Sequence, residues 1–147
     1  MDHELREEAD VEALQATVLA GIRSADPPAV PQRDYQPLAI ALRAPSGEVV
    51  GGVHGATMWQ WLMIDGVWVA ADPRGQGLGR RLVLAAEAAA IARGCRGAWL
   101  GTFDFQARGF YERLGYTVFG ELPGFPPGHT HFELRKQFAE SASARGG

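Results

Sequence analysis

The sequence predicts an α/β domain in which a sheet is covered by helices. Segments of strand length and segments of helical period follow one another along the chain, and glycine and proline fall between them. The chain has 147 residues, of which 46% are hydrophobic and 21% charged, as in ordinary globular proteins. We therefore expect one domain over residues 1–147, with an N-terminal helix and proline-rich loop over 1–36 and a flexible tail over 140–147.

The charge balance and the cysteine content restrict the partners. The formal net charge is -3, whereas nucleic-acid-binding proteins usually carry a basic excess. No stretch approaches the roughly 20 apolar residues of a membrane span, and the N-terminus "MDHELREEAD" is acidic where a secretory signal is basic and then apolar. We expect a cytoplasmic protein that binds neither nucleic acid nor membranes. Cys95 is the single cysteine, and we interpret it as a small packing residue.

The first third of the chain predicts a helix, a loop and a hairpin. Residues 10–24, "DVEALQATVLAGIRS", repeat apolar residues on one helical face. Four prolines between residues 25 and 37 indicate a loop over the surface or a lid near the site. Residues 37–58 contain two apolar runs around Pro45-Ser46-Gly47, which are typical turn residues. They predict an antiparallel hairpin.

A central strand is predicted over residues 59–70, "WQWLMIDGVWVA". Its apolar residues fall on both faces, as in a strand buried between layers. Asp65-Gly66 in its middle is either a hairpin turn or a bulge. The segment "VWVA" is short for a return strand, which favours a bulge that redirects the end of the strand.

The second half predicts further strands and helices. Residues 78–93, "LGRRLVLAAEAAAIAR", are rich in helix formers, and Gly94 ends this helix. A strand "GAWLGTF", a short helix "QARGFYERL" and the strands "YTVFGEL" and "THFELRKQF" follow. This order predicts an α/β sheet with helices on its faces.

The stretch "ADPRGQGLGRR", residues 71–81, places glycines at alternate positions between the central strand and the long helix. A nucleoside-triphosphate loop requires Gly-Lys-Ser/Thr, and a dinucleotide loop requires glycines at positions one, three and six; the stretch has neither pattern. The pattern Arg74-x-x-Gly77-x-Gly79 remains. Its glycines would let a pyrophosphate approach the unpaired N–H groups of a helix N-terminus. The alternative is a tight turn before a solvated helix start.

This pattern resembles the acetyl-CoA signature of the GNAT superfamily of N-acetyltransferases, which is Arg or Gln, two residues, Gly, one residue, and Gly or Ala after a central strand. The segment "VWVAADPRGQGLGRRLV" matches it residue for residue. The segment "FYERLGY" at 110–116 is similar to the second hallmark of the family, Tyr-Glu-Lys/Arg-x-Gly-Phe/Tyr. The resemblance covers roughly residues 37–136 and implies a mixed, mostly antiparallel central sheet with helices on both faces.

The resemblance implies acetyl-CoA as co-substrate and no metal. The pantetheine would pair like an added strand with the end of the central strand, and the pyrophosphate would lie on backbone amides of the glycine stretch. The implied cofactor-binding residues are Val67, Trp68, Val69, Arg74, Gly75, Gln76, Gly77, Leu78, Gly79 and Arg80. A kink at Asp65-Gly66 would open a cleft for the pantetheine and would hold the thioester carbonyl near a free backbone N–H.

The resemblance also implies acetyl transfer to a primary amine by direct attack in a ternary complex. Tyr111 falls at the family's general-acid position, and its alternative role is a core aromatic residue. Gly101 occupies the place where we expect a carboxylate base. Asp104 is a candidate base or a capping residue. His129 and His131 are candidates at the acceptor side or solvated turn residues.

The acceptor class stays open at the level of sequence. The resemblance implies a small-molecule amine or a peptide amine, and the four tryptophans form either core or an aromatic acceptor pocket. One alternative function is a non-catalytic acetyl-CoA-binding or regulatory module. Another is a structural domain, in which the last strand pairs across a homodimer.

Overall fold

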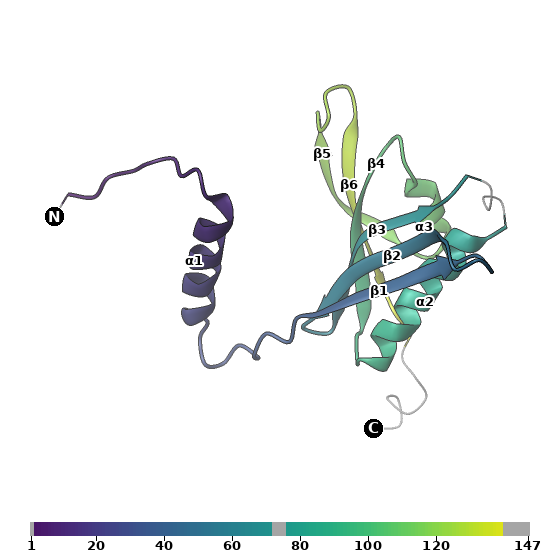
Figure 1. Ribbon diagram of the computed structural model, residues 1–147, viewed down its shortest axis with the longest axis horizontal. Helices are drawn as coiled ribbons and strands as arrows, with labels where there is room; N and C mark the ends of the chain where they lie inside the picture. Colours follow the sequence, from purple (N-terminus) through teal and green to yellow (C-terminus); the bar gives the residue numbers. More distant parts are fainter. Residues whose placement is uncertain (1, 72–75, 140–147) are drawn as a thin grey trace. The chain divides into compact units, whose positions relative to one another are not determined.

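The computed structural model describes residues 2–71 and 76–139 (Figure 1). The chain divides into two compact units, Met1–Gln32 and Arg33–Gly147. A single domain over residues 1–147 stays a prediction. The expected tail over residues 140–147 lies outside the described residues.

The first unit contains the helix that was predicted over residues 10–24. Helix α1 runs over Val11–Ser24, and the carboxylate of its N-cap Asp10 accepts a hydrogen bond from the backbone N–H of Ala13 at 3.0 Å. This bond satisfies one of the donors that a helix N-terminus leaves unpaired. The apolar period and the acidic cap together explain why the helix starts here.

The second unit is built on one six-stranded sheet with the strand order β1-β2-β3-β4-β6-β5. Strands β3 and β4 are parallel, and every other neighbouring pair is antiparallel. The expected mixed, mostly antiparallel sheet is therefore confirmed. Its strands are β1 Gln36–Arg43, β2 Val49–Met58, β3 Trp61–Val69, β4 Gly97–Phe103, β5 Thr117–Pro123 and β6 Thr130–Gln137.

Two helices of this unit pack against the sheet. Helix α2 runs over Leu78–Ala92 and α3 over Arg108–Arg113, and α2 crosses the back of β1, β2 and β3 in Figure 1. Residues of both helices belong to a single core, so both helices lie on the same face of the sheet. Helices were expected on both faces, and the described residues of this unit place them on one. The core residues that they share with the strands include Leu82, Val83, Ala86, Leu100, Tyr111 and Leu134. Cys95 is part of this core, as its packing interpretation required.

A buried ionic cluster attaches α2 to the last strand. The Glu87 carboxylate accepts hydrogen bonds from the Tyr116 hydroxyl and from the Lys136 ammonium, both at 2.8 Å. Glu87 is 5% exposed. Burial, and then the charge of Glu87, raise the pKa of Tyr116, so this hydroxyl remains a donor. The cluster fixes the rotation of α2 on the sheet.

The two hairpins at the start of the sheet use different turns. The β1–β2 turn around Gly47, whose φ is 91°, confirms the predicted hairpin. The β2–β3 turn consists of Trp59 and Gln60, at φ 48° and 66°. Non-glycine residues seldom adopt such values, but hydrogen bonds hold this turn in place. The Trp59 N–H donates to Asp34 Oδ1 at 2.8 Å, and the Gln60 carbonyl accepts from the Arg96 N–H at 2.7 Å.

The predicted bulge in the central strand is present. In the β2–β3 register His54 faces Gly66 and Gly55 faces Ile64, so Asp65 is the additional residue. A Cβ at Gly55 would clash with the backbone of Met63, and glycine therefore permits the close approach of the two strands. Strand β3 continues to Val69 beyond the bulge, which excludes the alternative of a hairpin turn at Asp65-Gly66.

Candidate active site

Strands β3 and β4 separate beyond the bulge. They pair only where Trp61–Ile64 face Gly97–Leu100, within the described residues. The bulge redirects the end of β3, and a cavity of about 320 Å³ lies where the two strands diverge. The predicted splaying of the central strand is thus confirmed. The cavity is lined by Ile64, Asp65, Gly66, Val67, Leu100, Gly101, Thr102, Gln106, Ala107 and Tyr111.

The end of β3 offers a free backbone edge to this cavity. Residues 67–69 pair with β2 on one side, and the described part of β4 gives them no partner on the other. Val67 and Val69 pack against the core, whereas Trp68 is 55% exposed. Anchored side chains and an unpaired edge are what a strand-like ligand requires.

The glycine stretch leads into the N-terminus of α2. Gly77 is the N-cap residue at φ 70°, without a side-chain cap, and glycine adopts this conformation readily. The first helical bond runs from the Arg81 N–H to the Gly77 carbonyl at 3.1 Å. The amides of residues 78–80 therefore have no partner within the helix. Gln76 and Arg80 are exposed there, and Arg74 and Gly75 lie outside the described residues.

Small residues keep the start of α2 close to α3. A Cβ added to Gly79 would come within 3.5 Å of the Phe110 ring, the neighbour of Tyr111. The predicted cofactor residues that the structure describes therefore lie on two adjacent elements, the end of β3 and the start of α2.

The position of Tyr111 is compatible with both of its predicted roles, the general acid and the core aromatic residue. Its side chain is 8% exposed, packs in the core and lines the cavity between β3 and β4. Among the described residues no group hydrogen-bonds its hydroxyl. Burial raises the pKa of Tyr111, because the low-dielectric surroundings disfavour phenolate. The hydroxyl therefore stays protonated at neutral pH and is available as a donor.

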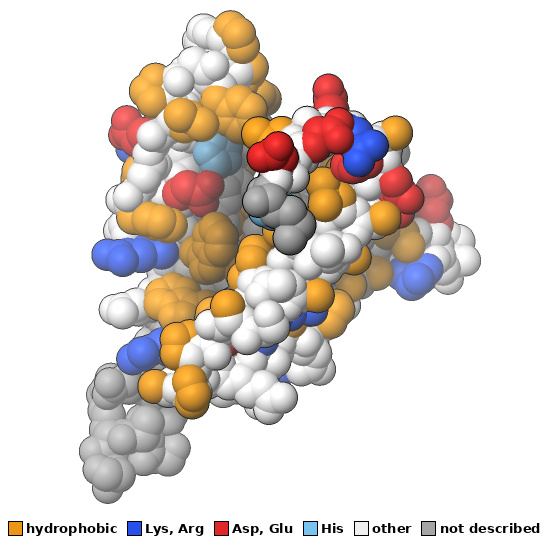
Figure 2. Space-filling view, turned by 90° about the vertical axis from the view of Figure 1, so that its left-hand side faces the viewer, with side chains coloured by type: hydrophobic (Ala, Val, Ile, Leu, Met, Phe, Trp, Pro, Cys, Tyr) orange, Lys and Arg blue, Asp and Glu red, His pale blue; other side chains and the backbone are white. Residues whose placement is uncertain are grey.

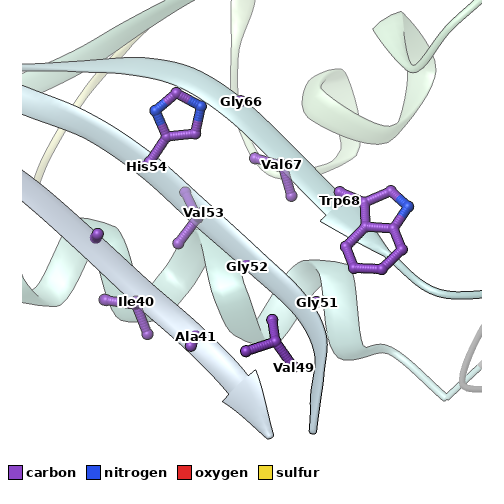
Figure 3. Close-up of a pocket in the computed structure, with 11 residues that line it drawn as sticks. Ile40, Ala41, Val49, Gly51, Gly52, Val53, His54, Gly66, Val67 and Trp68 are labelled. Atoms are coloured by element: carbon purple, nitrogen blue, oxygen red, sulfur yellow. The ribbon is translucent and has the colours of Figure 1, made fainter.

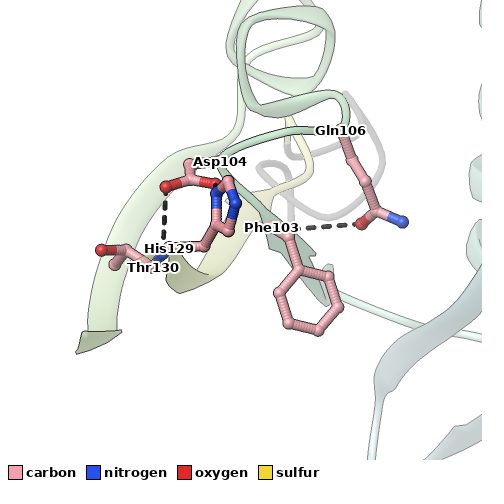
Figure 4. Close-up of polar contacts among 5 residues, drawn as sticks. All are labelled: Phe103, Asp104, Gln106, His129 and Thr130. Carbon is pink, nitrogen blue, oxygen red and sulfur yellow. Dashed lines mark hydrogen bonds and ion pairs between the residues drawn. The ribbon is translucent and has the colours of Figure 1, made fainter. Parts of the chain in front are cut away.

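Asp104 has two structural partners (Figure 4). Its Oδ1 is 2.8 Å from His129 Nδ1, and its Oδ2 accepts a hydrogen bond from the Thr130 N–H at 3.0 Å. These contacts join the end of β4 to the start of β6. Asp104 does not line the cavity between β3 and β4. The surroundings favour the capping role, and a role as base stays a prediction.

The end of β4 is held by a second capping contact. The Phe103 N–H donates to the Gln106 Oε1 at 3.1 Å (Figure 4). The Thr102 hydroxyl donates to the same oxygen at 3.3 Å. The amide of Gln106 thereby connects the strand to the short turn before α3, which carries Tyr111.

The structure brings His131 and Glu133 together above Gly101. Glu133 faces Gly101, and His131 faces Phe103, in the β4–β6 register. His131 Nδ1 lies 3.6 Å from Glu133 Oε1. A Cβ added to Gly101 would lie 2.6 Å from His131 Nε2 and 3.2 Å from Glu133 Oε1. A carboxylate from the neighbouring strand thus lies next to position 101, where a carboxylate was expected.

Glu133 was not identified from the sequence. The available signal was the alternation in "THFELRK", which places His131 and Glu133 on one face of a strand and Phe132 and Leu134 on the other. Glu133 and Gly101 are far apart in the sequence. Their contact could not be predicted, because only the strand order makes β4 and β6 neighbours.

A second hollow lies over strands β1, β2 and β3 (Figure 3). It has a volume of about 470 Å³, and small residues such as Ala41 and Gly52 form its floor. The side chains of His54 and Trp68 stand at two places along its border (Figure 3). Trp68 lines this second hollow, which shares Gly66 and Val67 with the cavity between β3 and β4.

Two kinds of feature are absent from the part of the chain that the structure describes. No helix there is long and apolar enough to cross a membrane. No group of three or more His, Cys, Asp or Glu side chains there is arranged to hold a metal ion.

The comparisons with known proteins agree with this geometry. Residues 8–116 match the model of the Acetyltransferase (GNAT) family. Blasticidin-S acetyltransferase of Streptomyces morookaense is 49% identical over 92 residues, 62% of this chain and 68% of that protein. Acetyltransferase Atu2258 of Agrobacterium fabrum is 36% identical over 107 residues, 73% of this chain and 78% of that protein. An acetyltransferase structure from Bacillus cereus ATCC 14579 matches with a TM-score of 0.81 at 28% identity, covering 92% of this chain and 98% of that one. The chain belongs to the GNAT family of acetyltransferases and is an enzyme of the acyltransferase class.

Proposed function

We propose that this enzyme transfers the acetyl group of acetyl-CoA to a primary amine by direct attack in a ternary complex. The observation that carries the proposal is the cavity between β3 and β4, which has the free edge of β3 on one side and Tyr111 on the other. Acetyl-CoA supplies the acyl group as a thioester. The residues present fit it, because the β3 edge is unpaired and the start of α2 has free amides and no side chain at Gly77 and Gly79.

Each part of the chain has a separate task in this proposal. The amides of residues 78–80 hold the pyrophosphate, aided by the positive end of α2. The edge of residues 67–69 orients the pantetheine, and a free backbone N–H of β3 stabilises negative charge that develops on the carbonyl oxygen. Tyr111 donates its proton to the departing sulfur.

The acceptor that we propose first is a small-molecule amine. Blasticidin S is the natural first compound to test, because an acetyltransferase for it shares 49% identity over 92 residues. Peptide amines are the second group. A homodimer and a cytoplasmic location remain predictions.

We expect thiol release from acetyl-CoA that depends on both the enzyme and an amine. The assay is a panel of blasticidin S, simple alkyl amines, polyamines and peptide N-termini, with thiol detection and mass spectrometry of the product. The expected result is one or more amines that gain a single acetyl group. Reactions without amine measure hydrolysis of the thioester.

Two outcomes would contradict the proposed transfer. Thiol release that is equal with and without every amine would make the chain a thioesterase of this fold. Binding of acetyl-CoA without turnover of any amine would favour the non-catalytic module.

A further inference from the structure

Different side chains lie on the two faces of the sheet at the gap between β3 and β4. Leu100 and Thr102 point into the core, at 2% and 3% exposure, on the face that also carries Tyr111. Because side chains alternate along a strand, Gly101 points to the opposite face. Its partner in the register, Glu133, points there too. The gap therefore has the tyrosine on one side and the glutamate on the other.

Glu133 carries an unsatisfied carboxylate oxygen. Its Oε2 is buried and has no hydrogen-bond partner among the described residues, while Oε1 has only the 3.6 Å approach of His131 Nδ1. The neighbouring cations are engaged elsewhere: Lys136 pairs with Glu87, and Arg135 lies over the Phe119 ring. A buried carboxylate oxygen without a donor is costly. The Glu133 side chain as a whole is 33% exposed, so a cationic N–H donor from a ligand can reach the carboxylate and offset this cost.

Exposed aromatic rings stand beside this carboxylate. Phe103 lies 4.9 Å from the His131 ring, 5.6 Å from Phe125 and 5.2 Å from Phe105, with which it is stacked. Phe105 and Phe125 are 56% and 52% exposed. Figure 2 shows hydrophobic side chains gathered around a histidine and an acidic side chain. A cluster of exposed rings is a surface that flat ligands cover. We call Phe103, Phe105, Phe125 and His131 the aromatic wall.

We propose that Glu133 binds the ammonium group of the acceptor and removes its proton, and that the aromatic wall binds a planar ring of the same molecule. The acceptor class is thus a small cationic amine that carries a flat ring. This assignment rests on the proposed transfer reaction. It places the base on β6 and the acid Tyr111 on α3, on opposite sides of the gap.

The proton and bond changes balance in this scheme. The ammonium nitrogen gives one proton to the Glu133 carboxylate, and its lone pair then attacks the thioester carbonyl carbon. The new C–N bond replaces the C–S bond, and the departing sulfur takes the proton of Tyr111. The nitrogen loses a second proton, which returns through solvent to Tyr111. Glu133 releases the first proton to water.

The test compares Glu133→Gln with the wild type on an acceptor found in the amine panel. We expect kcat/KM for the amine to fall by about a hundredfold or more, with the affinity for acetyl-CoA unchanged. The loss should shrink for an acyl hydrazide acceptor, whose terminal nitrogen is already unprotonated at neutral pH. Glu121→Gln is the matched control, because it removes an exposed carboxylate from the adjacent strand β5. It should retain wild-type rates.

A binding measurement makes the test independent of turnover. Calorimetry of ring-bearing and aliphatic amines with the enzyme–CoA complex should show tighter binding of the ring-bearing amine. It should also show at least tenfold weaker binding of that amine in Glu133→Gln. A wild-type enzyme that turns over no amine defeats the proposed transfer, and the calorimetry then decides whether Glu133 binds amines.

Three results would overturn the assignment of Glu133. One is a Glu133→Gln variant with wild-type amine kinetics and binding. Another is an equal loss for the acyl hydrazide and for protonated amines, which would indicate a structural role. The third is a loss in Asp65→Asn that Glu133→Gln does not share, since Asp65 is a carboxylate that lines the cavity itself.

Discussion

Replacing Tyr111 with phenylalanine is expected to lower turnover by about a hundred- to ten-thousand-fold while acetyl-CoA binds nearly as before. The substitution keeps the ring and its contacts with Phe110 and Tyr116, at centroid distances of 5.0 and 5.8 Å. It removes only the hydroxyl, which no described residue uses as a hydrogen-bond partner. The proton matters only as the thiolate leaves, so kcat and kcat/KM should fall together in steady-state kinetics.

Tyr116→Phe is the matched control for this experiment. The Tyr116 hydroxyl donates to Glu87 at 2.8 Å, so its loss should cost about 1.5–3 kcal/mol of stability and leave turnover of the folded enzyme intact. We therefore expect Tyr111→Phe to lower turnover with little change in stability, and Tyr116→Phe to lower stability with little change in turnover. Turnover of Tyr111→Phe within about threefold of the wild type would leave Tyr111 as a packing residue, since a general acid contributes far more than that.

Glu87→Ala is expected to destabilise the fold by about 3 kcal/mol, the lower end of the range for breaking a buried ion pair. The change leaves the Lys136 ammonium and the Tyr116 hydroxyl without their shared acceptor. The Lys136 side chain is 22% exposed, and water therefore recovers part of the loss. Urea unfolding followed by tryptophan fluorescence measures the difference through the transition midpoint.

Glu112→Ala provides the comparison for that measurement. Glu112 pairs with Arg108 at 3.1 Å on the exposed surface of α3, and such pairs contribute about 0.5 kcal/mol or less. Equal losses for Glu87→Ala and Glu112→Ala would show that the buried cluster does not hold α2 on the sheet.

Local signals in the sequence were sufficient for the elements that carry the predicted cofactor-binding residues. The bulge at Asp65 followed from the shortness of the segment after it, and the start of α2 followed from the glycines and the alanine-rich run. These features depend on residues that are close in sequence, and their backbone requirements are specific.

Contacts between distant segments could not be predicted in the same way. Glu87 looks like a surface residue in an alanine-rich helix, and its burial depends on Lys136, which is 49 positions away. The Trp59-Gln60 turn lacks the usual asparagine and glycine. Hydrogen bonds to Asp34 and Arg96, which lie outside the turn, stabilise it instead. Glu133 lies beside Gly101, where a carboxylate was expected, only because β6 lies beside β4.

The central claim is that the pantetheine of acetyl-CoA adds as a strand to the free edge of β3. Amide hydrogen exchange, resolved by residue with NMR, tests it most directly. We expect acetyl-CoA to slow exchange of the β4-facing amides within residues 67–69 and of the amides of residues 78–80. ATP lacks a pantetheine arm and should leave the β3 amides unprotected. Unchanged exchange along β3 with saturating acetyl-CoA, or protection confined to the hollow over β1 and β2, would contradict the claim.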